Sequence, residues 1–318
     1  MRNLRRTCLR AWALPVLMAW NPSAWPAADT VAGERFDIGG YRLNLACQGH
    51  GRPAVVMDAG LGGSSSDWRY VQRDLRRRTM ACVYDRAGYG FSDDGPKPRN
   101  SERIVSELRA LLREAKISPP WVLVGHSFGG YNMRLLASRY PHEVVGLVLV
   151  DAPHEGQIDR FLDSKFLRGL DKQGLLRHLW ESNLLSDALE QIGPFASLMG
   201  LHDRTALTVV NELAAYRQSS DSLREADLPR DLPVTVIMHG HRFLPGGSVG
   251  EELEEDWLEL QRDLAARHPH SRFIIAKKSD HNVEFQQPEL ISDAVAELLD
   301  RRDPHRATPG VADRPYWR

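Results

Sequence analysis

The 318-residue sequence carries almost no net charge and has no long run of lysine or arginine. Its 41 lysine and arginine residues are balanced by 42 aspartate and glutamate residues, which gives a formal net charge of -1. Proteins that bind nucleic acid through its phosphates usually carry a strongly basic surface, and this composition gives no sign of one. We therefore expect no nucleic-acid partner.

Cysteine is also scarce, with three residues at positions 8, 47 and 82. Neither Cys47 nor Cys82 lies in a spacing typical of metal ligands. Cys8 would leave with the leader described next, so an even number of cysteines remains. Whether Cys47 and Cys82 pair depends on the fold and on an oxidising compartment.

No apolar run in the first thirty residues is long enough to cross a bilayer comfortably. Residues 1–10 are basic, residues 11–20 are apolar, and residues 21–30 are rich in small residues and proline. This order predicts an export signal peptide over residues 1–28 and an exported protein, periplasmic or secreted. The segment LRRTCLR resembles a twin-arginine signal, with Cys8 where an aromatic residue is usual. A plain N-terminal extension, or a misassigned start codon, is the alternative.

The remaining chain has the composition of an ordinary globular protein, with 42% hydrophobic and 26% charged residues. Strands are expected at 34–38, 41–47, 54–58, 80–84, 121–124, 144–150, 233–238 and 272–276. Helices are expected at 101–115, 128–140, 257–267 and 288–299, the first of them with Ser101 as its N-cap. This alternation predicts an α/β protein with a parallel sheet covered by helices on both faces.

One region breaks the alternation. Residues 155–227 are helical in character and show no strand signal. We expect a helical lid over residues 152–227, inserted between two parts of the core at 34–151 and 228–300. The polar, proline-containing segment 301–318 is expected to be a disordered tail.

The sequence GHSFG at residues 125–129 matches the pattern G-x-S-x-G and lies between an expected strand and an expected helix. In such a turn the serine backbone is strained, its hydroxyl projects above the sheet, and the glycines avoid collisions. Ser127 is therefore a candidate nucleophile. A glycine-rich turn with an incidental serine is the other interpretation.

A serine hydroxyl is barely nucleophilic at neutral pH and needs a base, which a third group orients. Binding crevices of parallel sheets lie beyond the carboxyl ends of the strands, so the partners should follow other strands. His281 follows the strand expected at 272–276, and Asp151 follows the one expected at 144–150. The order along the chain is then Ser, Asp, His.

Five segments, DAGLGGSSSDW, YDRAGYGFSD, VGHSFGG, LVLVDAPH and SDHNVEFQQPELI, occur in an order that resembles the α/β-hydrolase superfamily. The resemblance covers roughly residues 36–299 and points to the serine-nucleophile, esterase-like branch related to haloalkane dehalogenases and epoxide hydrolases. It implies a mostly parallel eight-stranded sheet with a helical lid insertion. It also implies that the strands carrying Cys47 and Cys82 are neighbours, so that a disulfide and two buried thiols both remain open.

The acidic residue that would orient the base, the third member of the catalytic triad, departs from the commonest pattern. Most relatives carry it after the seventh strand in a Gly-x-x-Asp motif, and here residues 240–243 read GHRF, without a carboxylate. Some relatives place it after the sixth strand, which selects Asp151. The alternatives are that Asp151 caps a loop while Glu155, Glu251 or Glu252 supplies the acid.

The resemblance also assigns an oxyanion hole. Its N–H groups would come from Phe128, directly after the nucleophile, and from Leu61 in the glycine-rich loop after the third strand. His126 is expected to be structural. His239 and His241 have the spacing of a metal pair, but no third ligand is evident.

A serine at position 127 predicts acyl transfer, since epoxide hydrolases and dehalogenases of this fold use aspartate there. We expect a small-molecule ester-like substrate, no metal or organic cofactor, and no strong membrane binding. An amide, lactone or carbon–carbon bond hydrolase remains the alternative enzyme, and a non-catalytic ligand-binding protein the alternative of another class.

Overall fold

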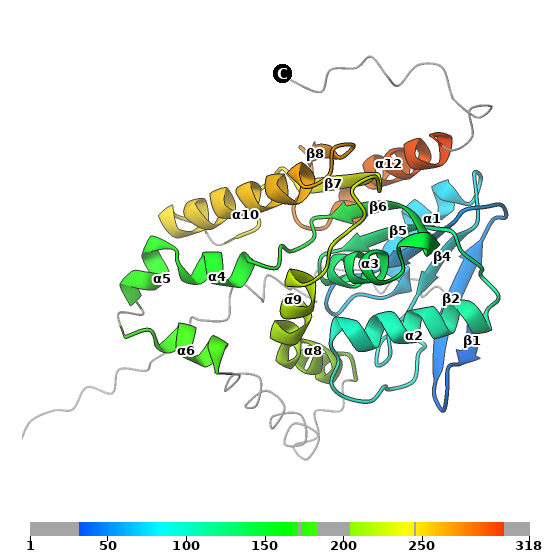
Figure 1. Ribbon diagram of the computed structural model, residues 1–318, viewed down its shortest axis with the longest axis horizontal. Helices are drawn as coiled ribbons and strands as arrows, with labels where there is room; N and C mark the ends of the chain where they lie inside the picture. The colour runs from blue at the N-terminus through cyan, green and yellow to red at the C-terminus, as the bar shows by residue number, and fades with distance from the viewer. Residues whose placement is uncertain (1–31, 171–172, 183–203, 245, 302–318) are drawn as a thin grey trace, which may run out of the picture.

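The computed structural model describes residues 32–170, 173–182, 204–244 and 246–301 (Figure 1). The expected signal peptide, and all of the expected tail except Arg301, lie outside these residues. Within them, no helix combines the length and the apolar character needed to cross a membrane.

The centre of the molecule is an eight-stranded sheet in the order β1-β2-β4-β3-β5-β6-β7-β8. The strands are β1 (Glu34–Asp37), β2 (Arg42–Gln48), β3 (Ala54–Asp58), β4 (Ala81–Tyr84), β5 (Trp121–His126), β6 (Val144–Val150), β7 (Val234–His239) and β8 (Arg272–Ala276). The β1–β2 and β2–β4 pairs are antiparallel and the other five pairs are parallel. The predicted fold class, with its eight strands and mostly parallel sheet, is confirmed.

Alternate residues of the central strands pack on opposite faces of this sheet. Val56, Leu123 and Leu147 belong to a core shared with α2 (Ser101–Glu114) and α3 (Phe128–Arg139). Their neighbours in the strands pack instead against α1 (Arg69–Leu75) and α12 (Pro288–Asp300). The two helix layers are visible in Figure 1, where α2 and α3 lie in front of the sheet. The period-2 burial of the strands therefore produces the helix–sheet–helix layering.

Five helices lie between β6 and β7 in the described part of the chain. They are α4 (Gln157–Leu162), α5 (Lys165–Leu170), α6 (Leu175–Glu181), α8 (Arg204–Ala214) and α9 (Tyr216–Arg224). The aromatic ring of Tyr216 packs on Phe128 and Tyr131, with ring centroids 5.8 Å and 5.4 Å away. The inserted helix α9 therefore contacts the helix that begins directly after Ser127.

Several local features differ from the sequence expectation. Helix α10 (Ser248–Ala266) begins nine residues before the predicted start at 257. The prediction missed its first turns because they are acidic and carry no clear apolar stripe. Arg160 of α4 pairs with Asp256 of this helix at 2.6 Å. Helix α1 was not predicted, since seven residues are too few for a clear period. The N-cap of α2 is Asn100, whose side chain accepts the Arg103 N–H, so the prediction of Ser101 was wrong by one residue.

Cys47 and Cys82 form a disulfide between the antiparallel strands β2 and β4. The two residues are direct cross-strand partners, with Cα atoms 4.0 Å apart. The alternative of two buried thiols is thereby excluded. The bond ties the antiparallel edge of the sheet to its parallel part.

Removing this disulfide should weaken the fold. The bond closes a loop between residues 35 apart, so the double variant Cys47→Ala, Cys82→Ala should lose about 2–4 kcal/mol of unfolding free energy. Denaturant unfolding of the two proteins measures the difference. Reducing the wild type should produce a comparable loss, and equal midpoints for oxidised and reduced protein would contradict the prediction.

Candidate active site

Ser127 lies at the turn that joins β5 to α3 and has an unusual backbone conformation, with φ 47° and ψ -126°. A positive φ is costly for a residue with a side chain, so the surroundings must hold it. The Ser127 N–H donates to the Val150 carbonyl at 3.0 Å, and the Ser127 carbonyl accepts from Gly130 N at 2.8 Å. The side chain remains partly exposed. This is the geometry predicted for an accessible hydroxyl on a strained turn.

The glycines on either side of Ser127 are required by close packing. A Cβ on Gly125 would lie 2.6 Å from the Gly129 carbonyl oxygen. One on Gly129 would overlap the carbonyl oxygens of Asp58 and Ala59. The helix start after Ser127 therefore presses directly against the end of β3, and no larger residue fits.

Asp151 and His281 are brought together from the ends of β6 and β8. The His281 Nδ1–H donates to Asp151 Oδ2 at 2.6 Å. Asp151 is fully buried and also has a positive φ, 44°. Its N–H donates to the Ile237 carbonyl at 2.6 Å, which anchors the strained residue to β7. Burial would raise the pKa of Asp151, but contacts with His239 and His281 outweigh it and hold the pKa well below its usual range.

The imidazole of His281 is held between two other rings. It stacks on Phe243 and lies against His126, each with ring centroids 4.8 Å apart. The His281 carbonyl accepts a hydrogen bond from His126 Nε2 at 2.9 Å, which links the base to the residue before Ser127. No hydrogen bond joins Ser127 Oγ to His281 in the described residues, and this contact is often long before substrate binds.

His126 has a structural part in this arrangement. Burial and the neighbouring His281 lower the pKa of His126 to about 3, so the ring is neutral. Its Nδ1 lies 3.1 Å from Glu284 Oε1, and burial, reinforced by Asp67, raises the pKa of Glu284 well above its usual value. A protonated Glu284 can donate to Nδ1, which leaves the Nε2 proton for the His281 carbonyl.

Two residues that form hydrogen bonds with Asp151 were not predicted from the sequence as part of the site. His239 Nδ1 lies 2.8 Å from both carboxylate oxygens, and Trp257 Nε1–H donates to Oδ1 at 3.1 Å. The sequence signals at His239 were its position at the end of β7 and its two-residue spacing from His241. Both of its ring nitrogens face carboxylates, and the described residues hold no cluster of three metal-ligating side chains.

The alternative acids lie elsewhere. Glu155 is held by Arg134 at 2.9 Å and Arg267 at 2.5 Å. Burial opposes its charge, yet these cations lower the pKa of Glu155 to about 2. Glu251 pairs with the exposed Arg242, and Glu252 accepts the Lys165 N–H. Of the four carboxylates considered, Asp151 is the one that contacts His281.

Two backbone N–H groups are available beside Ser127. Phe128 is the first residue of α3, where no intrahelical acceptor exists. Within the described part of the chain, neither its N–H nor that of Leu61 has a hydrogen-bond acceptor. A Cβ on Gly60, the residue before Leu61, would lie 3.2 Å from Ser127 Cβ. The loop thus approaches the serine closely, and both N–H groups are candidates for donating to a substrate oxygen.

The loop before Leu61 is fixed by the buried guanidinium of Arg86. This side chain donates to the carbonyl oxygens of Ala59 at 2.6 Å and Gly60 at 2.8 Å. It also pairs with Asp58 at 2.7 Å and with Glu212 of the inserted helix α8 at 2.8 Å. Burial opposes its charge, but the two carboxylates outweigh it and raise the pKa of Arg86. One cation therefore joins the core, the loop and the insertion.

Replacing Arg86 should be strongly destabilising. In Arg86→Met, Asp58 and Glu212 lose the cation that compensates their burial, which should cost about 3–5 kcal/mol of unfolding free energy. Chemical denaturation measures this loss.

A matched control is Arg113→Met, which breaks an exposed ion pair with Glu114. Such pairs contribute little, so its stability should stay close to that of the wild type. Equal losses in both variants would contradict the assigned importance of the buried network.

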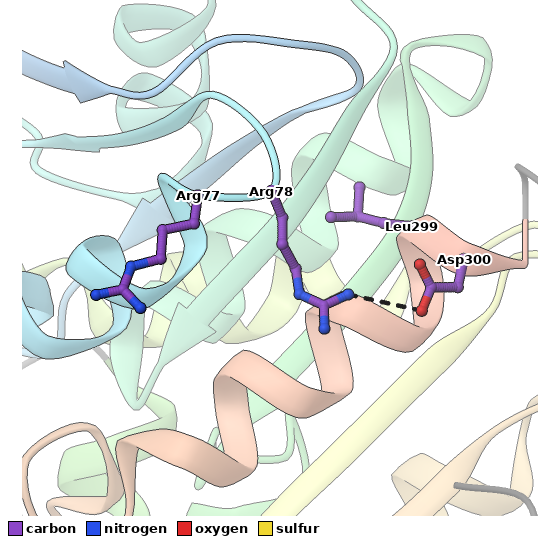
Figure 2. A pocket seen from close by; sticks show the side chains of 4 residues that line it. All are labelled: Arg77, Arg78, Leu299 and Asp300. Atoms are coloured by element: carbon purple, nitrogen blue, oxygen red, sulfur yellow. Dashed lines mark ion pairs between the residues drawn. The ribbon is translucent and has the colours of Figure 1, made fainter. Parts of the chain in front are cut away.

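A separate pocket lies at the other end of the sheet, and Figure 2 shows its lining side chains. Its lining residues are Arg77, Arg78, Leu299 and Asp300. Arg78 and Asp300 form an ion pair at 3.7 Å. Arg78 comes shortly before the amino end of β4, whereas Ser127 follows the carboxyl end of the parallel strand β5. This pocket is therefore not the site around Ser127.

Comparisons with known proteins agree with the fold. A model of the alpha/beta hydrolase family matches residues 55–294, more than half of the chain. An uncharacterized protein, YqjL of Bacillus subtilis, is 25% identical over 245 residues, which are 77% of this chain and 82% of YqjL. A putative carbamate hydrolase, RutD of Pantoea ananatis, is 27% identical over 273 residues, covering 83% of this chain and 94% of RutD.

Solved structures show the same architecture. A thermophilic esterase from Thermogutta terrifontis superimposes with a TM-score of 0.56 at 19% identity, covering 84% of this chain and 98% of the esterase. At that identity the likeness concerns the fold. The chain belongs to the alpha/beta hydrolase family.

Proposed function

We propose that the protein is a serine hydrolase that cleaves small carboxylic esters through an acyl-enzyme intermediate. The observation that supports this most directly is the 2.6 Å hydrogen bond from His281 Nδ1 to the buried Asp151 carboxylate, at the sheet edge where Ser127 lies. That bond fixes the ring so that Nε2 is the nitrogen left to accept a proton.

In the proposed reaction, Ser127 Oγ attacks the ester carbonyl carbon while its proton passes to His281 Nε2. The N–H groups of Leu61 and Phe128 donate to the oxyanion that forms. His281 then returns the proton to the leaving alcohol, and the C–O ester bond breaks. A water molecule then gives a proton to His281 and attacks the acyl carbon. The bond from that carbon to Ser127 Oγ breaks, His281 returns the proton to Oγ, and the carboxylic acid leaves.

The substrate class rests on the nucleophile and on the insertion. Serine at position 127 favours acyl chemistry over epoxide or haloalkane opening. We propose that residues 152–227 form the lid that shapes the acyl and alcohol pockets, as the contacts of Tyr216 with Phe128 and of Glu212 with Arg86 suggest. Amides, lactones, carbamates and carbon–carbon bonds are alternative substrates for the same machinery.

The proposal includes export. Residues 1–28 read as a signal peptide, and the disulfide between Cys47 and Cys82 is of the kind that persists in oxidising compartments. The substrate would then be met outside the cytoplasm.

Labelling with a fluorophosphonate, followed by intact-mass analysis, tests the reaction. The wild type should gain one adduct, because an activated serine attacks phosphorus as it attacks a carbonyl. Ser127→Ala should gain none. Asp151→Asn should label at least about a hundredfold more slowly, since His281 loses its orienting carboxylate.

Ser66→Ala is the control, because Ser66 is a buried serine to which no catalytic part is assigned. It should label at the wild-type rate. A folded wild type that takes no label would instead support a non-catalytic ligand-binding protein. Labelling with turnover of lactones or carbamates but not of short acyl esters would reassign the substrate class.

A further inference from the structure

Two imidazoles share the Asp151 carboxylate, and the proposed reaction uses only one of them. His281 donates through Nδ1 to Oδ2 at 2.6 Å. His239 places Nδ1 2.8 Å from each oxygen, and its backbone N–H also donates to Oδ1 at 3.2 Å. Among the described residues with hydrogen bonds to the Asp151 carboxylate, His239 therefore makes more of them than His281 or Trp257.

The second nitrogen of His239 faces another carboxylate. Its Nε2 lies 2.8 Å from Glu254 Oε2, while Glu254 Oε1 accepts the N–H groups of Phe243 and Leu244, both at 3.0 Å. A neutral imidazole has a single N–H and would turn a lone pair toward one of the two carboxylates. The imidazolium can donate to both at once, and the two N–H groups on Glu254 favour its ionised form, so the geometry favours a proton on each nitrogen of His239.

The surroundings of His239 support this charge state. Its side chain is only 2% exposed, and the rings of Phe243 and Trp257 lie 4.8 Å and 6.0 Å from it. Burial alone would lower the pKa of His239, but Asp151 and Glu254 outweigh it and raise the pKa to about 10. Asp151 at the end of β6 and Glu254 on α10 are the charged groups that contact it.

We propose that His239 is a permanently protonated positioning residue that fixes Asp151 and weakens the attraction of its carboxylate for a proton on His281. This inference rests on the proposed serine-hydrolase reaction for its kinetic effect. The charge state of His239 itself does not depend on that reaction.

The consequence follows from counting charges near His281. Asp151 and Glu254 contribute two negative charges, and the His239 imidazolium cancels one of them. Of the other groups near His281, His126 is neutral and Asp280 is the adjacent residue in the chain. Without the His239 charge, more negative charge would face the His281 ring and oppose its release of a proton.

Two variants should move the pH profile of fluorophosphonate labelling in opposite directions. His239→Gln removes a positive charge, so the acid limb of the rate profile should move up by about one pH unit. Glu254→Gln removes a negative charge and leaves His239 in place, so the acid limb should move down. Its shift should be smaller, because His239 stands between Glu254 and Asp151.

The matched control is His241→Gln, which removes an exposed histidine in the loop directly after β7, two residues beyond His239. Its acid limb should coincide with that of the wild type. A purely structural part for His239 would lower the labelling rate at every pH without moving the limb. That outcome, or shifts of the same sign in both variants, would overturn the proposal.

Nuclear magnetic resonance of protein labelled with ¹⁵N-histidine tests the charge directly. The wild type should show one imidazolium that stays protonated from pH 6.5 to 8.5, and this signal should be absent from His239→Gln. A neutral His239 in that range would overturn the proposal even if labelling succeeds. A wild type that takes no label would end the ester-hydrolase proposal, while the spectrum would still decide the charge of His239.

Discussion

The buried carboxylate of Asp151 is the group on which the site depends. It gathers hydrogen bonds from His239, His281 and Trp257, which come from three different parts of the chain. A buried anion is stable only when donors and cations compensate it. The ends of β6 and β7, helix α10 and the loop after β8 are therefore held in place by one negative charge, and the orientation of His281 follows from it.

Backbone strain accompanies this electrostatic arrangement. Ser127 and Asp151 both have a positive φ, and they follow the neighbouring parallel strands β5 and β6. Each is anchored to the next strand, through Val150 and Ile237 respectively. These hydrogen bonds to the neighbouring strand thus offset the conformational cost of the positive φ at both positions. Rigid strands on either side allow two strained residues to present their side chains at one edge.

The sequence predicted the sheet, because the buried strands were short apolar runs whose pattern needs no knowledge of distant residues. It also predicted Ser127, His281 and Asp151 as candidates, since each follows an expected strand at the same edge. The contacts of His239 and Trp257 with Asp151 could not be predicted, for a physical reason. Their importance comes from hydrogen bonds to Asp151 across 88 and 106 residues, and nothing in the local sequence around either residue reports such a contact. The start of α10 was missed because an acidic, solvated face has no apolar period.

The ion pair between Arg86 and Glu212 has a further consequence for how the chain assembles. Its two partners are 126 residues apart in the sequence, and His281 follows both of them. A chain emerging from the ribosome presents Arg86 and the loop before Leu61 long before Glu212 has been made. Arg86 and Asp58 therefore stay hydrated until residue 212 has been made, and the native network around them can be completed only then. Fragments that end before residue 212 lack Glu212 and should therefore be substrates for chaperones and proteases.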